Sequence, residues 1–125
     1  MCLRYLLIGL VLGLCYSSCS SEEAFRAQGK KIVKEIVATL KGVENHEELE
    51  AATGRLKKHF KKLARLLAEV RAFRKSHPDA VWEERALPES EELFIQLARL
   101  YEIPGCREIM ERSQGDAVSL LLRSQ

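Results

Sequence analysis

Cysteine thiols and a cluster of basic side chains are the groups in this 125-residue chain that could do chemistry. Cys19 follows Ser17 and Ser18, and its thiol could stay free, join a disulfide or carry a covalently attached lipid. Cations between Lys57 and Arg65 could hold an anionic surface through their charge. The residues around each group decide between these uses.

The residues before Cys19 are typical of a secretory signal peptide. Arg4 is the only charge ahead of an uncharged apolar run of about ten residues, YLLIGLVLGL, from Tyr5 to Leu14. A membrane-spanning helix needs roughly 20 such residues. We therefore expect residues 1–18 to be a signal peptide that is removed.

Tyr16, Ser17, Ser18 and Cys19 resemble the lipobox of bacterial lipoprotein precursors, in which small residues precede a modified cysteine. In that family the cysteine thiol receives a diacylglycerol, the peptide bond before it is cut, and the new amine is commonly acylated. The resemblance implies a lipidated N-terminus at Cys19, with enough acyl chains for stable anchoring in a membrane. Residues 19–23 would then form this N-terminus and a short tether.

Ser20 bears on where the mature protein goes. After the cysteine it resembles a signal for the outer membrane, so we expect an envelope protein that faces the periplasm. The alternative is ordinary cleavage after Ser20, with Ser18 and Ser20 as the small residues of the cleavage site, which would give a soluble secreted protein without Cys19. Because Cys2 and Cys15 leave with the signal in either case, a disulfide-dense scaffold is excluded.

The rest of the chain, residues 24–125, is expected to fold as one small helical domain. Apolar residues over 22–41 recur at spacings of three, four and seven, which indicates an amphipathic helix that ends at Gly42. Asn45 followed by Glu48 is a capping-box pattern and predicts a second helix that continues to about residue 75. The short connection predicts an antiparallel helical hairpin.

Two or three further helices are expected after the hairpin. The stretch 76–84 reads as a turn and a new helical start, and Pro88 introduces a helix. Pro104 and Gly105 interrupt the chain before a last helical segment, in which Gly115 is a candidate break. The fold class is therefore all-α, a bundle of four to five helices. The helix after Pro88 should bury the apolar residues Leu93, Phe94, Leu97, Leu100 and Tyr101.

The second helix has a core side and a basic side. Steps of 100° per residue place its large apolar residues in one sector and its cations in another. The basic side could bind lipid phosphates or lipopolysaccharide, although long cationic side chains also simply solvate a helix. Nucleic acid is not expected as a partner, because an exported protein does not meet it and because no platform of aromatic residues lies among the cations to stack on bases. The basic residues are Lys57, Lys58, Lys61, Lys62 and Arg65.

Cys106 is the one thiol expected within the folded domain. It lies near a helix N-terminus, a setting that can lower a thiol pKa, but the sequence offers no neighbouring base. It is expected to be a small buried hydrophobe or one half of an intermolecular disulfide.

Neither a catalytic group nor a cofactor or metal is indicated. The histidines His46, His59 and His77 are too scattered for a metal motif, and adjacent glutamates on a helix diverge by about 100° and cannot form a carboxylate pair. We expect a non-enzymatic envelope protein that presents a helical surface to a protein partner, with anionic lipid binding as the alternative.

Charge is divided unevenly between the two halves of the chain. Residues 22–77 hold 14 basic and 8 acidic side chains, a balance of +6, whereas residues 78–125 hold 5 and 10, a balance of −5. Because the two halves can attract each other, this asymmetry does not by itself require an external partner.

Overall fold

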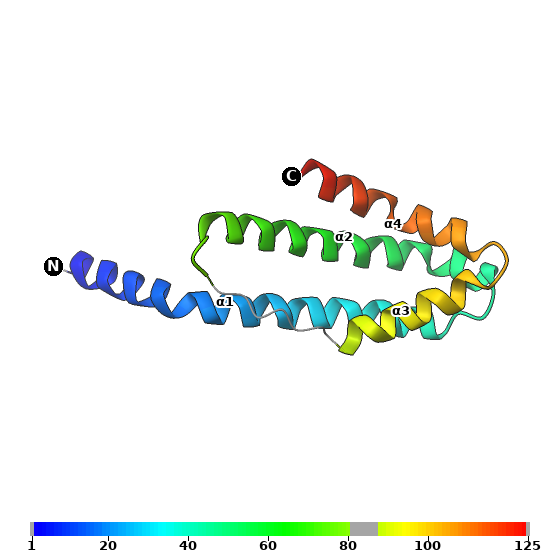
Figure 1. Cartoon of the computed structure of the whole chain (residues 1–125), viewed down its shortest axis with the longest axis horizontal. Helices are drawn as coiled ribbons and strands as arrows, with labels where there is room; N and C mark the ends of the chain where they lie inside the picture. Colours follow the sequence, from blue (N-terminus) through cyan, green and yellow to red (C-terminus); the bar gives the residue numbers. More distant parts are fainter. Residues whose placement is uncertain (1, 81–87, 125) are drawn as a thin grey trace.

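The computed structural model describes the backbone of residues 2–80 and 88–124, and side chains from Ser21 onward within these ranges. Four helices account for nearly all of it: α1 (Cys2–Lys41), α2 (His46–Ser76), α3 (Pro88–Tyr101) and α4 (Cys106–Arg123). They run roughly along the long axis of the molecule and alternate in direction (Figure 1). The expected all-α bundle with four to five helices is confirmed, with four.

Helix α1 is longer than expected. The sequence predicted a start near Glu22 after a short tether over residues 19–23, but α1 is continuous from Cys2 to Lys41. Glu22 pairs with Arg26 one turn later at 3.1 Å, an i,i+4 contact that supports the helix where the tether was expected. The tether is therefore helical.

The turn between α1 and α2 has the capping that the sequence predicted. Asn45 Oδ1 accepts a hydrogen bond from the backbone N–H of Glu48 at 2.9 Å, and Glu48 Oε2 accepts one from the backbone N–H of Glu44 at 2.8 Å. These bonds satisfy donors that the start of α2 would otherwise leave unpaired. They fix where the chain reverses, so that α1 and α2 pack as the expected antiparallel hairpin.

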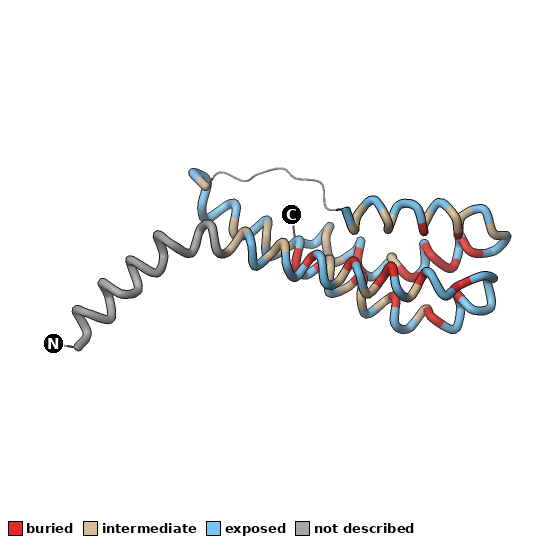
Figure 2. Tube along the Cα trace, turned by 90° about the horizontal axis from the view of Figure 1, so that it is seen from below, coloured by how far each residue is buried: buried red, intermediate tan, exposed pale blue. Residues whose placement is uncertain are grey.

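The helices contact one another in the cyclic order α1, α2, α4, α3. Helix α2 packs along both α1 and α4, whereas α3 packs along α1 and touches α4 only slightly; within the described residues the diagonal pairs α1–α4 and α2–α3 make no contact. Buried residues concentrate at the end of the bundle that holds the α1–α2 turn and the α3–α4 junction (Figure 2). The largest fully buried apolar side chains are Ile36, Leu40, Leu49, Leu56, Leu100 and Met110.

Helix α4 begins at a strained turn and then continues without a break. Gly105, with φ +83°, precedes Cys106, and a left-handed backbone at that position favours glycine. The break considered at Gly115 is wrong. Gly115 lies on the exposed side of α4, while Ser113 and Ala117 on either side of it are buried, so packing outweighs the helix-weakening effect of one glycine, about 1 kcal/mol.

The region between α2 and α3 was expected to turn and restart a helix over 76–84. Ser76 ends α2, and the backbone N–H of Ala80 donates to the carbonyl of His77 at 3.1 Å, which closes a turn. The expected helical start beyond it falls on residues 81–87, which lie outside the described part of the chain.

Phe94 is the main error in the expected core. It is 72% exposed, and its neighbour Ile95 is 54% exposed, although Leu93, Leu97 and Tyr101 of the same helix pack against the core. The cause is the placement of α3, which follows α1 but meets α4 little. Phe94 therefore does not belong to the buried side of α3, which is formed by Gln96 and Leu100.

Arg99 fastens α3 to the end of α1. Its guanidinium donates to the carbonyl oxygens of Val43 and Leu40, each at 2.8 Å, and to the side-chain oxygen of Gln96 at 3.0 Å. The last carbonyls of a helix have no intrahelical partner and carry partial negative charge. A cation there is therefore favoured both as a hydrogen-bond donor and by its charge. The hydrogen bond to Val43 spans 56 positions of the sequence, and the one to Leu40 spans 59.

We predict that Arg99→Ala lowers the free energy of unfolding by about 2–3 kcal/mol, because it removes two charge-assisted hydrogen bonds and leaves the Val43 carbonyl unpaired, while the Leu40 carbonyl keeps its bond from the Val43 N–H. Urea unfolding followed by circular dichroism measures the change. Arg107→Ala is the control, since that guanidinium only lies over the Tyr101 ring at 5.2 Å and should contribute less than about 1 kcal/mol. Equal losses in the two variants would contradict the capping role of Arg99.

Candidate functional site

The five cations predicted on the second helix lie around one shallow surface depression. Gly54 of α2 and Asp116 of α4 also line it. Three of the cations are exposed, while Lys57 and Lys61 are partly covered. The depression is lined by Lys57, Lys58, Lys61, Lys62 and Arg65, which we call the α2 basic surface.

Packing of α2 explains why these cations gather. The helix buries a stripe that includes Leu56, Phe60 and Ala64 against its neighbours, so the intervening positions must point outward. Lys61 Nζ lies 3.7 Å from Asp116 Oδ2, an exposed and weak ion pair. Among the described residues, the other four cations of this surface have no ion-pair partner.

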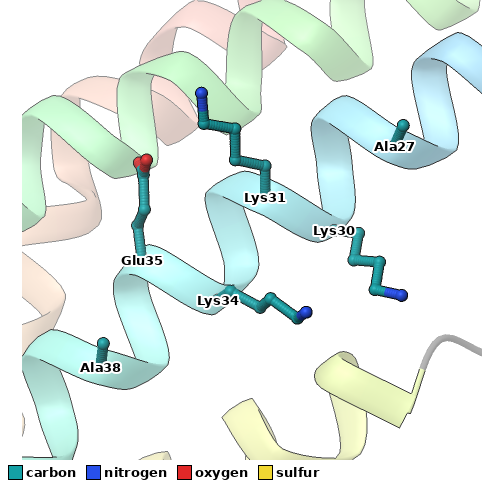
Figure 3. Close-up of a pocket in the computed structure, with 6 residues that line it drawn as sticks. All are labelled: Ala27, Lys30, Lys31, Lys34, Glu35 and Ala38. Carbon is teal, nitrogen blue, oxygen red and sulfur yellow. The ribbon is translucent and has the colours of Figure 1, made fainter.

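A second group of lysines lies on the adjacent α1. Lys30, Lys31 and Lys34 line another open depression on that helix, with Ala27 and Ala38 at its two ends (Figure 3). Lys31 points toward α2, whereas Lys30 and Lys34 point toward α3 (Figure 3). Sequence reasoning missed this group. The small residues at 27 and 38, spaced from Lys31 and Lys34 by helical steps, were the available signal.

One carboxylate and one imidazole separate the two lysine groups. Glu35 of α1 points toward α2 (Figure 3), and its Oε2 lies 3.2 Å from His59 Nδ1, without the angle of a hydrogen bond. The α1 lysines and the α2 basic surface are therefore neighbours across the hairpin.

Other lysines on α1 hold the acidic start of α3. Lys30 Nζ lies 3.5 Å from Glu89 Oε1, and Lys41 Nζ lies 3.3 Å from Glu92 Oε1. A backbone hydrogen bond at Glu89 itself, helped by Lys30 and Lys34, holds the pKa of its carboxyl below the usual value. A hydrogen bond from Gln96, with Lys41 beside it, lowers the pKa of Glu92.

These pairs explain part of the charge asymmetry. Lys30, Lys41 and Lys61 belong to the basic half of the sequence, and their partners belong to the acidic half. Attraction between the halves is thus satisfied in part by ion pairs at the surface of the bundle, as the sequence allowed. The cations left over lie on the outer sides of α1 and α2.

Cys106 is fully buried at the first turn of α4. Burial raises the pKa of its thiol, and the nearby Arg99 guanidinium offsets only part of that effect. The lowering of the pKa considered from its place at a helix N-terminus is therefore wrong, because loss of hydration outweighs the helix dipole. An intermolecular disulfide through this thiol would require the α3–α4 junction to open.

The remaining predicted groups stay apart or lie outside the described side chains. Cys19 belongs to α1, but its side chain is outside the described set, so its lipidation remains a prediction. His46 begins α2, His77 ends it and stacks on Phe73 at 4.2 Å, and His59 lies between them. In the described part of the chain, no three metal-ligating side chains come together.

None of the helices, as far as they are described, has an apolar stretch long enough to cross a membrane. Comparison of the chain with protein-family models, with curated proteins and with solved structures gave no match.

We predict that the Cys106 thiol reacts with a maleimide roughly a hundredfold more slowly in the native protein than in urea, because the thiolate cannot form while buried. Raising the pH from about 7 to about 9 should speed both reactions, because native labelling passes through an opened state whose thiol has its ordinary pKa of about 8.5, while the native rate should stay far below the unfolded rate. Peptide mass spectrometry measures modification at this residue alone, and Cys106→Ala is the blank. Rapid native labelling would show that the junction opens readily.

Proposed function

We propose that this protein is a bacterial lipoprotein, held by acyl chains on Cys19 in the cell envelope, whose helical bundle acts as a non-enzymatic binding module. The support is the apolar run before the cysteine and the small residues Ser17 and Ser18 that precede it. An outer-membrane location facing the periplasm belongs to the same proposal, through Ser20.

The observation that carries the binding role is the exposed apolar pair on α3. Phe94 and Ile95 are large, adjacent and mostly open to solvent at 72% and 54%. Removing a side chain of this size from water contributes about 1.5–3 kcal/mol, and aromatic residues often dominate protein interfaces. A helical surface centred on this pair suits a protein partner in the envelope.

A second candidate function is binding of anionic lipid or lipopolysaccharide. The specific observation that favours it is the gathering of Lys57, Lys58, Lys61, Lys62 and Arg65 around one depression, with most of the cations unpaired among the described residues. Phosphate groups are the chemistry that such a surface attracts, and salt should weaken the attraction.

We predict that the protein made in a bacterial host begins at Cys19 and carries acyl mass, and that Cys19→Ser loses both this mass and its membrane association. Intact-mass analysis with cell fractionation measures both. Ser18→Ala is a matched control, since a small residue before the cysteine is retained. A mature chain that begins at Ser21 without modification would contradict the anchor and would indicate the secreted alternative.

We predict that a photo-crosslinking residue at position 94 captures a specific envelope protein in the native cell, because an exposed aromatic position would lie within that interface. The same residue placed at Glu111, which is exposed on α4, is the control. Gel analysis and mass spectrometry identify the products. Identical products from both positions would show that Phe94 does not mark an interface.

A further inference from the structure

We propose that the outer side of the α1–α2 hairpin docks flat on an anionic phospholipid bilayer, and that the α1 lysines Lys31 and Lys34 form half of this docking surface. The inference rests on the second candidate function, the binding of anionic lipid. It enlarges the binding surface from one helix to two and gives the bundle an orientation on the membrane.

The two lysine groups lie on adjacent helices, and Lys31 points toward α2 while Lys34 points toward α3 (Figure 3). On α1, Lys31 and Lys34 are exposed, and on α2 the exposed cations are Lys58, Lys62 and Arg65. The contact between Glu35 and His59, at 3.2 Å, lies between the groups and puts them side by side. Helix axes in contact are 8–10 Å apart, so the surface is about two helices wide.

Charge on this surface is largely unbalanced. Among its acidic neighbours, Glu89 lies against Lys30 and Asp116 against Lys61. Glu35 lies beside His59, and Glu69 is exposed one turn after Arg65 and offsets part of the positive charge. Glu48 lies farther along the hairpin, near its turn, beside Arg55. Among the described residues, Lys31, Lys34, Lys57, Lys58, Lys62 and Arg65 have no ion-pair partner, although Lys34 lies near enough to Glu89 to help lower the pKa of that carboxyl.

The shape suits a plane of lipid headgroups better than a single small anion. Both depressions are shallow, and Figure 3 shows the lysines of α1 spread apart along the helix instead of converging on one point. Lysine side chains hold charge at the end of a flexible stem and can each meet a different phosphate.

Continuity of α1 adds a second argument. Cys19 and Lys30 belong to the same helix and are 11 residues apart, which corresponds to about 16 Å along the axis. A lipid on that cysteine would keep the α1 lysines within reach of the headgroups. The basic surface and the anchor would then act together, because the first contact raises the effective concentration of the second.

The test measures which lysines the bilayer covers. Mature full-length protein from a bacterial host is bound to phosphatidylcholine vesicles with or without phosphatidylglycerol and treated with a membrane-impermeant amine reagent. Peptide mass spectrometry then gives the labelling of each lysine. Lys41, which pairs with Glu92 of α3, serves as the internal reference.

We expect labelling of Lys31, Lys34, Lys58 and Lys62 to fall at least fivefold on anionic vesicles, while Lys41 is unchanged. High salt should restore it, because salt screens charge over a few ångströms. In Lys31→Gln/Lys34→Gln, the concentration of anionic vesicles needed for half-maximal protection of Lys58 and Lys62 should rise about 25-fold, since each lysine near an anionic surface strengthens binding by roughly fivefold. Arg107→Gln/Arg123→Gln removes the same charge from α4 and should match the native protein.

Four results would overturn the proposal. Equal labelling of all four lysines on neutral and anionic vesicles would show that the hairpin does not face the bilayer. Protection of the α2 lysines alone would remove the α1 half, and equal protection by dissolved inorganic phosphate would indicate a general anion site. If mass analysis finds no acyl group, the unanchored protein should still sediment with anionic vesicles; failure to do so would contradict this inference separately from the anchor.

Discussion

Burial of the apolar stripe of α2 between α1 and α4 is the constraint on which the rest of the structure depends. Leu49, Leu56, Phe60 and Ala64 recur at helical spacing, and all are buried. Because a helix that buries one stripe must expose the opposite side, the lysines between these positions are forced outward together. The same packing therefore produces both the core and the basic surface.

Helix α3 is attached to this core by polar contacts as much as by apolar ones. Leu100 is fully buried, but the two lysine–glutamate pairs and the Arg99 cap determine how α3 lies along α1. Exposed ion pairs are individually weak, typically below about 1 kcal/mol, whereas Arg99 donates to the carbonyl of Val43 and adds a second donor to that of Leu40, which also accepts from the backbone N–H of Val43. With this attachment, Phe94 and Ile95 stay exposed.

Local signals predicted the helices well, and long-range contacts decided what they missed. Two features depend only on residues close together in the sequence: the capping of α2 by Asn45 and Glu48, and the position of the interruption between α3 and α4. The sequence alone was sufficient to predict both. The exposure of Phe94 depends on how the helices pack against one another. The spacing of apolar residues along α3 does not show this packing. The α1 lysines could be read as a helix surface, but only the packing of α1 against α2 joins them to the second basic group.

The environment of Cys106 also depends on long-range contacts that the local sequence does not show. Its place at a helix N-terminus is visible in the sequence and favours a reactive thiol, while its burial comes from residues of other helices and has the larger effect on the pKa.

The central claim is that the hairpin lies flat on an anionic membrane. Neutron reflectometry of the mature protein on a supported bilayer that contains phosphatidylglycerol tests it most directly. We predict a protein layer about two helix diameters thick, roughly 20–25 Å, that thickens at high salt. A layer near 45 Å at low salt, the length of a 31-residue helix such as α2 standing upright, would contradict the account.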